Sequence, residues 1–528
     1  MNILVSALTL LVLWTQQSAG QNQPLWTHAE PGAIDFYEVT PLGNIVLATA
    51  GHLVGLDPGT GQPSWTYTHG QAKTYVSIAE TPYGLFDYGD HVDVIDLTKG
   101  ERLWGTADVG ISGLKGYLPY AERDLLLLYS GSTPDSSVLL AVGLGSGRVL
   151  WRHERPFAAA PKIHGALVQQ EKTANLLQGG QTPVLVTDTT FLLYVSEDGP
   201  VLVHAGTGAF LWRADVLKGE RPPALRDLYP EVLVRDSVVF IPFGKKLQAI
   251  RLRDGTAVWA KPAEFPSRVT QLESDSRGVL VRGARREYDA NRDDPFVQLV
   301  DPATGAQIWR WKKGSGIMNG AEPPPNTSPF VRRGNRAYFA WDGDVYTITL
   351  DKGAATKIGK VRFKGGEQPA IVENRPDGLL LWSAQNLLLV DTSGAVRYQA
   401  NYPAPPIGFL GHLASVALRV ALDVASYSLA ESEARRTGVP QTYEQYDNPF
   451  LRIRYAAAAD AAAYVYILTS QEDTDGQRRS LLVRVQKDRN SVEGRVWLSE
   501  KRPPFEVDPF TATVYVQTAP QQIAAFKF

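Results

Sequence analysis

The sequence predicts an all-β protein built from one repeated module of short strands. Apolar runs are separated by Gly, Pro, Asn and Asp along most of the chain, a pattern typical of strands joined by turns. In addition, Asp, Gly and Trp recur with the same spacing, as expected of a repeat architecture. With 528 residues, of which 44% are apolar, the size of the core does not limit the fold.

The stretch 299–309, LVDPATGAQIW, shows the module most clearly. Its apolar run predicts a strand, and Asp301 ends that strand because a carboxylate can accept backbone N–H groups one or two residues further on. Gly305 supplies the positive φ that the turn needs, and Trp309 lies on the next strand. Burying an indole removes roughly 150–250 Å² from water, worth about 4–6 kcal/mol at most. One tryptophan per module can therefore hold neighbouring sheets together.

The modules fall into complete and degenerate copies. The complete copies contain Asp57, Gly61 and Trp65; Asp96, Gly100 and Trp104; and Asp301, Gly305 and Trp309. The degenerate copies replace the Asp: Gly143 precedes Gly147 and Trp151, His204 precedes Gly208 and Trp212, and Arg251 precedes Gly255 and Trp259. Weaker copies contain Gly353, with Lys357 in place of Trp, and Asp391 with Gly394. Because Gly and Trp persist where Asp does not, we interpret these residues as a structural repeat.

Modules of this kind predict a β-propeller, in which four-stranded sheets are arranged as blades, as in WD40-like proteins. About ten strand groups can be counted, and eight blades, the upper end of the usual range, is the alternative. Residues 522–528 resemble the strand before the turn, and residues 24–26 resemble the strand after it. We therefore expect one propeller over residues 21–528, closed by its N- and C-terminal strands.

Two segments depart from the repeat. Residues 1–20 predict a signal peptide, because an apolar run over 3–14 precedes a small-residue step at 18–20. An uncleaved anchor is the alternative, since no Lys or Arg precedes the run. Inside a helical insertion at 400–448, residues 409–437 predict a long helix from the spacing of Leu413, Val416, Val420, Val424 and Tyr427. This helix is expected to be a lid packed across the propeller, with a partner-binding or membrane-contacting helix as the alternative.

Composition excludes several classes of protein. The chain has no cysteine, which excludes disulfides, Cys-ligated zinc, covalent haem and a thiol nucleophile. The formal net charge of -2 gives no general attraction to nucleic acid. A signal peptide without a further long apolar run predicts an exported protein, periplasmic or extracellular, with no transmembrane span in the mature chain. We expect this protein to be a monomer.

The spacing of Asp, Gly and Trp resembles the PQQ-like (quinoprotein alcohol dehydrogenase-like) β-propeller repeat family, whose members include quinoprotein alcohol dehydrogenases and the outer-membrane assembly factor BamB. The resemblance covers most of residues 25–528 and implies a BamB-like ring of four-stranded blades with a girdle of tryptophans. For a quinoenzyme, it also implies bound PQQ, a Ca²⁺ site and a catalytic Asp. No residue here matches a catalytic motif, so we assign no catalytic or cofactor-binding residue. BamB is lipid-anchored through an N-terminal Cys, which this chain lacks.

Asp289, Asn291 and Asp293 are weak candidates for a metal site, because their oxygen ligands alternate as at the start of a calcium loop. The pattern then stops, since Asp294 and Val300 stand where such a loop needs Gly and Glu. The eight His include no pair at metal-ligand spacing. We therefore expect no metal and no cofactor, with PQQ and Ca²⁺ as the alternative.

Long segments follow several of the tryptophan strands, at 152–180, 213–227, 310–328 and 400–448. Antiparallel strands should place these segments on one face of the propeller, opposite the Asp-Gly turns, and long loops on a rigid scaffold commonly bind partners. This pattern favours an exported, non-catalytic scaffold for protein interaction or assembly in the cell envelope, which binds another envelope protein through that loop face. The alternatives are a PQQ-dependent quinoprotein dehydrogenase and a carbohydrate or cell-wall binding protein.

Overall fold

The computed structural model describes residues 23–68, 74–78, 80–130, 138–154, 184–187, 189–195, 199–217, 232–284, 294–312, 328–365, 367–391, 393–405, 448–472, 476–498 and 504–528. The chain divides into two compact units. The first unit contains Met1–His69, Tyr402–Pro440 and Asn448–Phe528, and the second contains Gly70–Asn401 and Gln441–Asp447. The predicted signal peptide at 1–20, the predicted helix at 409–437 and the metal candidates Asp289, Asn291 and Asp293 lie outside the described residues.

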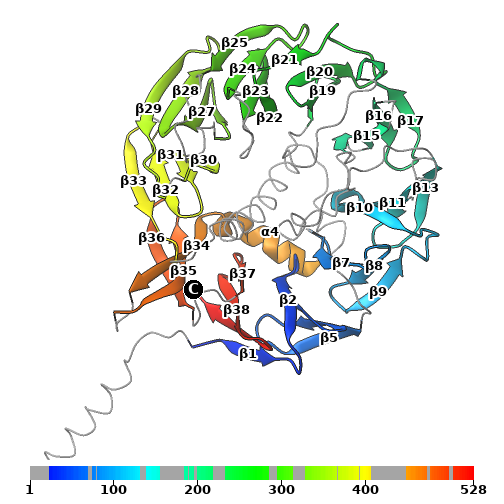
Figure 1. The fold of residues 1–528 in the computed structure, drawn as a ribbon, viewed down its shortest axis with the longest axis vertical. Coiled ribbons are helices and arrows are strands. Elements are labelled where there is room, and N and C mark those ends of the chain that lie inside the picture. Colours follow the sequence, from blue (N-terminus) through cyan, green and yellow to red (C-terminus); the bar gives the residue numbers. More distant parts are fainter. Residues whose placement is uncertain are drawn as a thin grey trace, which may run out of the picture. The chain divides into compact units, whose positions relative to one another are not determined.

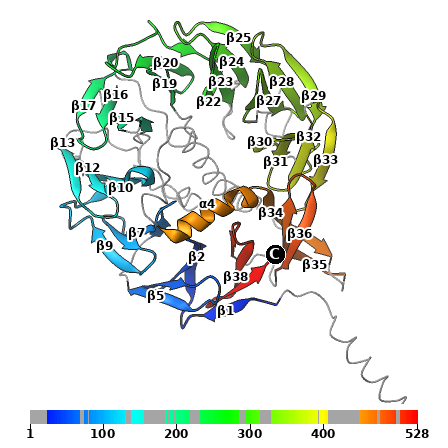
Figure 2. The same ribbon diagram turned by 180° about the vertical axis from the view of Figure 1, so that it is seen from behind.

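The predicted fold class, all-β with propeller blades of four strands, is confirmed. Nine antiparallel sheets have four strands each, and one has three among the described residues. There are thus ten blades and not eight. Figures 1 and 2 show the blades of the second unit following one another in chain order, from blue through green to yellow.

The second unit contains seven blades, and in each of them the strands pair in chain order. The first four blades are β6 (Thr74–Ser77), β7 (Tyr83–Asp87), β8 (Val92–Asp96) and β9 (Glu101–Gly105); β10 (Leu114–Tyr120), β11 (Leu125–Ser130), β12 (Val138–Gly143) and β13 (Val149–Glu154); β14 (Val184–Thr187), β15 (Thr190–Val195), β16 (Gly199–His204) and β17 (Phe210–Arg213); and β18 (Leu233–Arg235), β19 (Val238–Phe243), β20 (Lys246–Arg251) and β21 (Ala263–Glu264).

The remaining three blades are β22 (Arg268–Asp275), β23 (Gly278–Ala284), β24 (Phe296–Val300) and β25 (Gln307–Lys312); β26 (Val331–Arg333), β27 (Arg336–Trp341), β28 (Asp344–Thr349) and β29 (Ala355–Lys360); and β30 (Ile371–Arg375), β31 (Gly378–Trp382), β32 (Asn386–Val390) and β33 (Val396–Asn401). Short 3-10 helices are η1 (Ala121–Arg123) and η3 (Asp215–Leu217).

In its described residues, the first unit contains three blades and one α-helix. The blades are β2 (Ile34–Val39), β3 (Ile45–Thr49), β4 (His52–Leu56) and β5 (Pro63–Thr68); β34 (Tyr464–Glu472), β35 (Arg478–Gln486) and β36 (Ser491–Trp497); and β37 (Phe505–Asp508), β38 (Thr513–Ala519), β39 (Gln522–Lys527) and β1 (Trp26–Ala29). The helix is α4 (Pro449–Ala461), which directly precedes β34.

The last of these sheets joins the two ends of the chain. Strand β1 pairs antiparallel with β39, with Trp26 opposite Ala525, and the N–H of Leu25 donates to the carbonyl of Ala525 at 2.7 Å. The N-terminal strand is therefore the fourth strand of the blade whose other strands come from the C-terminal segment.

The core lies between adjacent sheets. Every residue of β3, β24, β31 and β32 is buried, because the middle strands of a blade are covered on both faces. Fourth strands are more exposed: in β25, Gln307 and Ile308 are exposed while Trp309 is buried. The tryptophan is thus the inward anchor of an otherwise exposed strand.

Each of six tryptophans packs on a glycine in the turn of the following blade. A Cβ added to Gly305, which has a φ of +75°, would lie 2.8 Å from Cδ2 of Trp259, so the indole lies directly on the backbone. The indole N–H of Trp259 donates to the carbonyl of Pro302, three residues before this glycine, at 3.0 Å. The same arrangement, with N–H to carbonyl distances of 2.6–2.8 Å, joins Trp26 to Gly61, Trp104 to Gly147, Trp151 to Gly208, Trp212 to Gly255, and Trp309 to Gly353.

Two copies depart from this arrangement. The indole of Trp65 is buried and lies over Gly55 of the neighbouring strand. At the junction after β29, Lys357 occupies the tryptophan position and forms an ion pair with Asp344, at 2.6 Å. A Cβ on Gly394 would lie 1.8 Å from the carbonyl oxygen of Ile358, so a direct backbone contact replaces the indole there.

We expect Gly305→Ala to lower the free energy of unfolding by about 3 kcal/mol. About 1 kcal/mol comes from forcing alanine into the left-handed region, and about 2 kcal/mol from the clash with the rigid indole. Gly334→Ala is the matched control, because Gly334 has a φ of +57° but nothing lies within 4 Å of an added Cβ. Chemical denaturation of both variants measures the difference. Equal losses would show that Gly305 serves the backbone turn alone.

Helix α4 begins at a well-formed cap. The side chain of Asn448 accepts hydrogen bonds from the N–H groups of Phe450 and Leu451, and Pro449 stands in the first turn, where its missing N–H costs nothing. An alanine-rich body then favours the helix. No helix was predicted over Pro449–Ala461 from the sequence.

A buried ion pair anchors α4 to the sheet that contains both chain ends. Nη1 of Arg454 lies 3.1 Å from each carboxylate oxygen of Asp508, whose side chain is fully buried. The guanidinium also lies over the ring of Phe510, 4.1 Å from its centroid. A Cβ on Gly43 would lie 2.8 Å from Nη1 of Arg454, so the turn between β2 and β3 packs against the same group. Residues of two blades and the helix thus meet at Arg454.

Candidate functional site

Each blade has two ends. We call the turn face the end where the first strand joins the second and the third joins the fourth, and the loop face the opposite end. In the blade β22–β25, the turns at 276–277 and 301–306 lie at the turn face. The Asp-Gly turns of the repeat all lie at this face, because antiparallel strands alternate in direction.

The repeat residues are engaged in closing these turns. Oδ1 of Asp57 accepts from the N–H groups of Gly59 and Thr60 at 3.0 and 2.8 Å, and Oδ1 of Asp301 accepts from Ala303 and Thr304, both at 2.8 Å. Asp96 accepts from the N–H of Thr98 at 2.7 Å. The glycines that follow, Gly61, Gly100, Gly147, Gly208, Gly255 and Gly305, have φ between +64° and +75°.

These bonds also set the charge of the carboxylates. Burial by itself would raise the pKa of Asp301, but the hydrogen bonds from Thr304 and Ala303 outweigh it and lower the pKa. The carboxylate therefore stays ionised as the acceptor of its own turn. These hydrogen bonds explain why an Asp stands at this position of the turn, and they leave its Oδ1 bound to backbone N–H groups.

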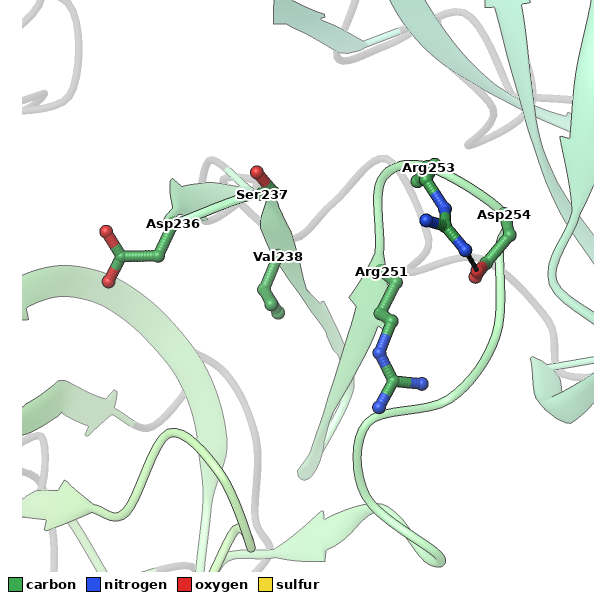
Figure 3. Close-up of a pocket in the computed structure, with 6 residues that line it drawn as sticks. All are labelled: Asp236, Ser237, Val238, Arg251, Arg253 and Asp254. Atoms are coloured by element: carbon green, nitrogen blue, oxygen red, sulfur yellow. Dashed lines mark ion pairs between the residues drawn. The ribbon is translucent and has the colours of Figure 1, made fainter.

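An open cavity of about 510 Å³ lies at the turn face of the blade β18–β21, and Figure 3 shows the residues that line it. Its lining residues are Asp236, Ser237, Val238, Arg251, Arg253 and Asp254. Asp236 and Ser237 form the turn between β18 and β19, both in the left-handed region, with φ of 49° and 63°. Their side chains and the Arg253–Asp254 pair point in different directions and do not converge (Figure 3).

The carboxylates of this cavity already have cationic partners. Asp236 lies 3.0 Å from Nε of Arg235, and Asp254 lies 3.7 Å from Arg253. Arg251, which replaces the Asp of the repeat, donates to Oγ1 of Thr256 at 3.0 Å, and Asp254 accepts from the N–H of Thr256. The cavity is thus a polar hollow between two turns. Its charged side chains already bind partners within those turns.

Arginines on the first strands tie successive blades of the second unit together. Nη1 of Arg235, on β18, donates to the carbonyls of Asp275 and Gly278 at 2.6 and 3.0 Å. Nη1 of Arg332, on β26, donates to the carbonyl of Ser274 at 2.7 Å and to Oδ2 of Asp275 at 3.1 Å. The turn between β22 and β23 is therefore held from both neighbouring blades.

Asp275 is the centre of these ties. Its carboxylate also accepts from Nε of Arg277 at 2.7 Å, and its side chain is only 5% exposed. The hydrogen bond from Arg277, the largest influence, lowers the pKa of Asp275, and Arg332 adds to it. Burial raises the pKa of the adjacent Glu273, although Arg332 lies 3.2 Å from it.

We expect Asp275→Asn to lower the free energy of unfolding at pH 7 by about 2 kcal/mol, because two arginines lose their counter-charge. Since the folded pKa lies below the ordinary value of about 3.9, the contribution of Asp275 is complete above that pH and is lost as the pH falls through the folded pKa. The difference between variant and wild type should therefore shrink towards pH 3 in urea titrations. A difference that persists there would contradict the ionic account. Asp236→Asn, whose side chain is 84% exposed, is the control.

In the described part of the loop face, a charged side chain also binds within its own blade. Arg310, at the start of the predicted long segment 310–328, donates to Oε1 of Gln298 within its own blade, and burial lowers its pKa. Residues 155–183, 218–231, 313–327 and 406–447, which contain most of the predicted long segments, lie outside the described residues. The loop-face site therefore stays a prediction.

The helix that follows the predicted insertion lies at the turn face. The insertion 400–448 was expected on the loop face, and its residues 406–447 lie outside the described residues. Helix α4, which follows the insertion, contacts the turns at Gly43 and Asp508, at the turn face. Strands β35 and β36 enclose the turn at 487–490 and so are third and fourth strands, which makes β34 a second strand. A second strand starts at the turn face, and α4 leads directly into β34. The spacing of residues in the sequence could not reveal the position of α4, because that position depends on which strand of the blade follows the insertion.

Helix α4 exposes two large apolar side chains. Phe450 is 53% exposed and Ile453 is 66% exposed, whereas Leu451, Arg454 and Tyr455 are buried. No helix among the described residues is both long and apolar enough to cross a membrane. Nor do three or more His, Asp or Glu side chains of the described part gather where they could hold a metal ion.

Comparisons with known proteins agree with the repeat. Residues 89–287 match the family model described as outer membrane protein assembly factor BamB. No curated protein sequence matches the chain significantly.

Several solved structures are similar in fold. BamB from Moraxella catarrhalis is 12% identical, with a TM-score of 0.36 over 78% of this chain and 96% of that one. The quinohemoprotein alcohol dehydrogenase ADHIIG from Pseudomonas putida HK5 is 10% identical, with a TM-score of 0.33 over 84% and 93%. The C-terminal WD40 domain of Sif2 is 9% identical, with a TM-score of 0.35 over 69% and 95%. The family model confirms the resemblance inferred from Asp, Gly and Trp over residues 89–287, where the chain carries PQQ-like β-propeller repeats.

Proposed function

We propose that this chain is an exported, non-catalytic propeller that acts as a protein-interaction or assembly scaffold in the cell envelope. The observation that carries the proposal is that the charged side chains of the repeat and of the blade junctions bind partners within the frame of the propeller. Asp275, Arg235 and Arg332 tie blades together, and Asp57 and Asp301 close turns. Charged groups committed in this way support a rigid frame rather than acid–base chemistry.

The quinoenzyme alternative would need carboxylates free to hold Ca²⁺ beside a quinone. In the described part of the chain, the neighbouring carboxylates Glu273 and Asp275 are bound by Arg332 and Arg277 and do not fit that role. Titration with PQQ and Ca²⁺, followed by dye reduction with alcohols and sugars, tests the point. A scaffold gives no saturable binding at micromolar PQQ, whereas PQQ-dependent dye reduction would overturn the proposal.

Export and partner binding have separate tests. Cleavage near residue 20 in protein recovered from the native host would support export, and an intact N-terminus in a cytoplasmic fraction would contradict it. Because the chain has no cysteine, a single introduced cysteine provides a unique crosslinking site. Ile453→Cys samples α4 at the turn face, and Lys312→Cys samples the exposed loop-face end of β25.

A scaffold should give one discrete crosslinked product from one of these faces. The partner, identified by mass spectrometry, should then bind the purified wild-type chain, and a serine at the productive position should weaken that binding. Diffuse or equal crosslinking from both faces would contradict a defined interaction face. The family model matched by residues 89–287 describes an assembly factor, which supports the proposal.

A further inference from the structure

Two histidines hold one turn of the second unit, at residues 204–208 between β16 and β17. His204 stands where complete copies of the repeat have Asp, and its Nδ1 accepts from the N–H groups of Gly206 and Thr207, both at 3.2 Å. His153, on β13 of the preceding blade, has its Nε2 2.5 Å from the carbonyl oxygen of Gly208.

The same turn receives the tryptophan of the preceding blade. The indole N–H of Trp151 donates to the carbonyl of Ala205 at 2.6 Å, and a Cβ on Gly208 would lie 2.6 Å from the indole. The ring of His153 packs against Trp151, with centroids 5.2 Å apart. The junction between these two blades therefore depends on the shape of this turn.

The two histidines have opposite proton requirements. A backbone N–H can only donate, so Nδ1 of His204 must offer a lone pair, and the ring must be neutral. A carbonyl can only accept, so Nε2 of His153 must carry a proton, as it does in the neutral Nε2–H tautomer and in the cation. Proton uptake thus removes both hydrogen bonds of His204 and preserves that of His153.

We propose that this turn is a proton-sensitive joint between the blades β10–β13 and β14–β17. Histidine ordinarily changes charge between pH 5 and 8, whereas Asp stays ionised down to about pH 4. Only the neutral ring of His204 accepts the two N–H groups, so its protonation removes the stabilisation that they provide. The carboxylate of Asp301, whose pKa the hydrogen bonds of its own turn lower, keeps its bonds on mild acidification. Mild acidification therefore loosens one joint of the propeller and leaves the Asp-closed turns intact.

Two neighbouring strands carry charged side chains. Strand β13 carries, besides His153, the exposed pair of Arg152 and Glu154, 3.1 Å apart. Strand β17 carries Arg213.

The following blade carries Arg251, Arg253 and Asp254 in the turn that receives Trp212 of β17. Strand β15 pairs the neutral Thr190 with His204, and β16 contains no titratable residue other than His204. Asp188, between β14 and β15, lies outside the described residues. The proton requirement of His204 depends on its two N–H donors and not on any of these groups.

Amide hydrogen exchange on the full chain tests the proposal, with rates corrected for the intrinsic effect of pH. Between pH 7.5 and pH 5.5, protection of Gly206 and Thr207 should fall about fivefold, the value of one ordinary hydrogen bond. Protection of Ala303 and Thr304, in the Asp301 turn, should not change. Equal behaviour of the two turns would overturn the proposal.

Two variants separate the roles of the histidines. His204→Asp restores the carboxylate of the repeat, so protection at pH 7.5 should be kept and the response to pH 5.5 should vanish. His153→Gln should lower protection at both pH values and leave the fivefold response in place. An unchanged response in His204→Asp, or a lost response in His153→Gln, would assign the effect to another group.

Discussion

Replacing Trp259 with alanine should lower the free energy of unfolding by about 4 kcal/mol, the largest single effect we expect from a side chain in the second unit. The indole is 1% exposed, lies on Gly305 and packs against Phe240 with ring centroids 5.7 Å apart. Its removal leaves a cavity at the junction of two blades and an unsatisfied carbonyl on Pro302. Urea unfolding of variant and wild type measures the loss.

Trp259→Phe separates packing from hydrogen bonding. Phenylalanine keeps much of the apolar contact but cannot donate to Pro302, so we expect a loss of about 2 kcal/mol. Leu211→Ala is the control, because Leu211 is 49% exposed on the fourth strand of another blade and should change stability by less than about 0.5 kcal/mol. A loss for Trp259→Ala as small as that of the control would mean that the indole is not an anchor.

Removing either partner of the buried pair between Arg454 and Asp508 should cost about 3–4 kcal/mol, because the remaining charge is left in a site closed to water. Asp508 also accepts from the N–H of Phe510 at 3.1 Å and from Oγ1 of Thr511 at 2.9 Å. Arg454→Met leaves those two bonds in place, whereas Asp508→Leu removes them. We therefore expect the loss from Asp508→Leu to be the larger of the two.

The double variant Arg454→Met with Asp508→Leu should cost clearly less than the sum of the single losses, since neither charge is then left alone. Thermal unfolding of the four proteins completes the cycle. Arg452→Met, on the exposed side of the same helix, is the control for the arginine. Additive losses would show that the two side chains act independently.

Much of the fold could be predicted because turn chemistry is local. The spacing from Asp57 to Gly61 and Trp65 fits within one turn and one strand, and the same spacing recurs at Asp301. The count of about ten strand groups followed from these local units, while the eight-blade alternative came from general experience with propellers and is wrong here.

The hydrogen bonds and ion pairs between blades could not be predicted from the sequence. Arg235 meets Asp275 across 40 residues, and Arg454 meets Asp508 across 54, and no spacing rule links them. Unlike these contacts, helix α4 carries local sequence signals, Asn448 followed by Pro449 and then a run of alanines, which are typical of the start and body of a helix. The part of the candidate site that depends on the long segments could not be located, since those residues lie outside the described part of the chain.

The pairing of β1 with β39 has a consequence for how the protein is made. Strand β1 is the first described strand along the chain, and its partner β39 is the last. Until β39 has been synthesised, the edge of β1 has no strand to pair with, although Trp26 can already pack on the turn at Gly61 and blades built from consecutive strands can form as they emerge. Pairing of β1 with β39 should therefore be a slow, late step of folding, and a nascent chain should depend on protection of β1 until β39 is complete.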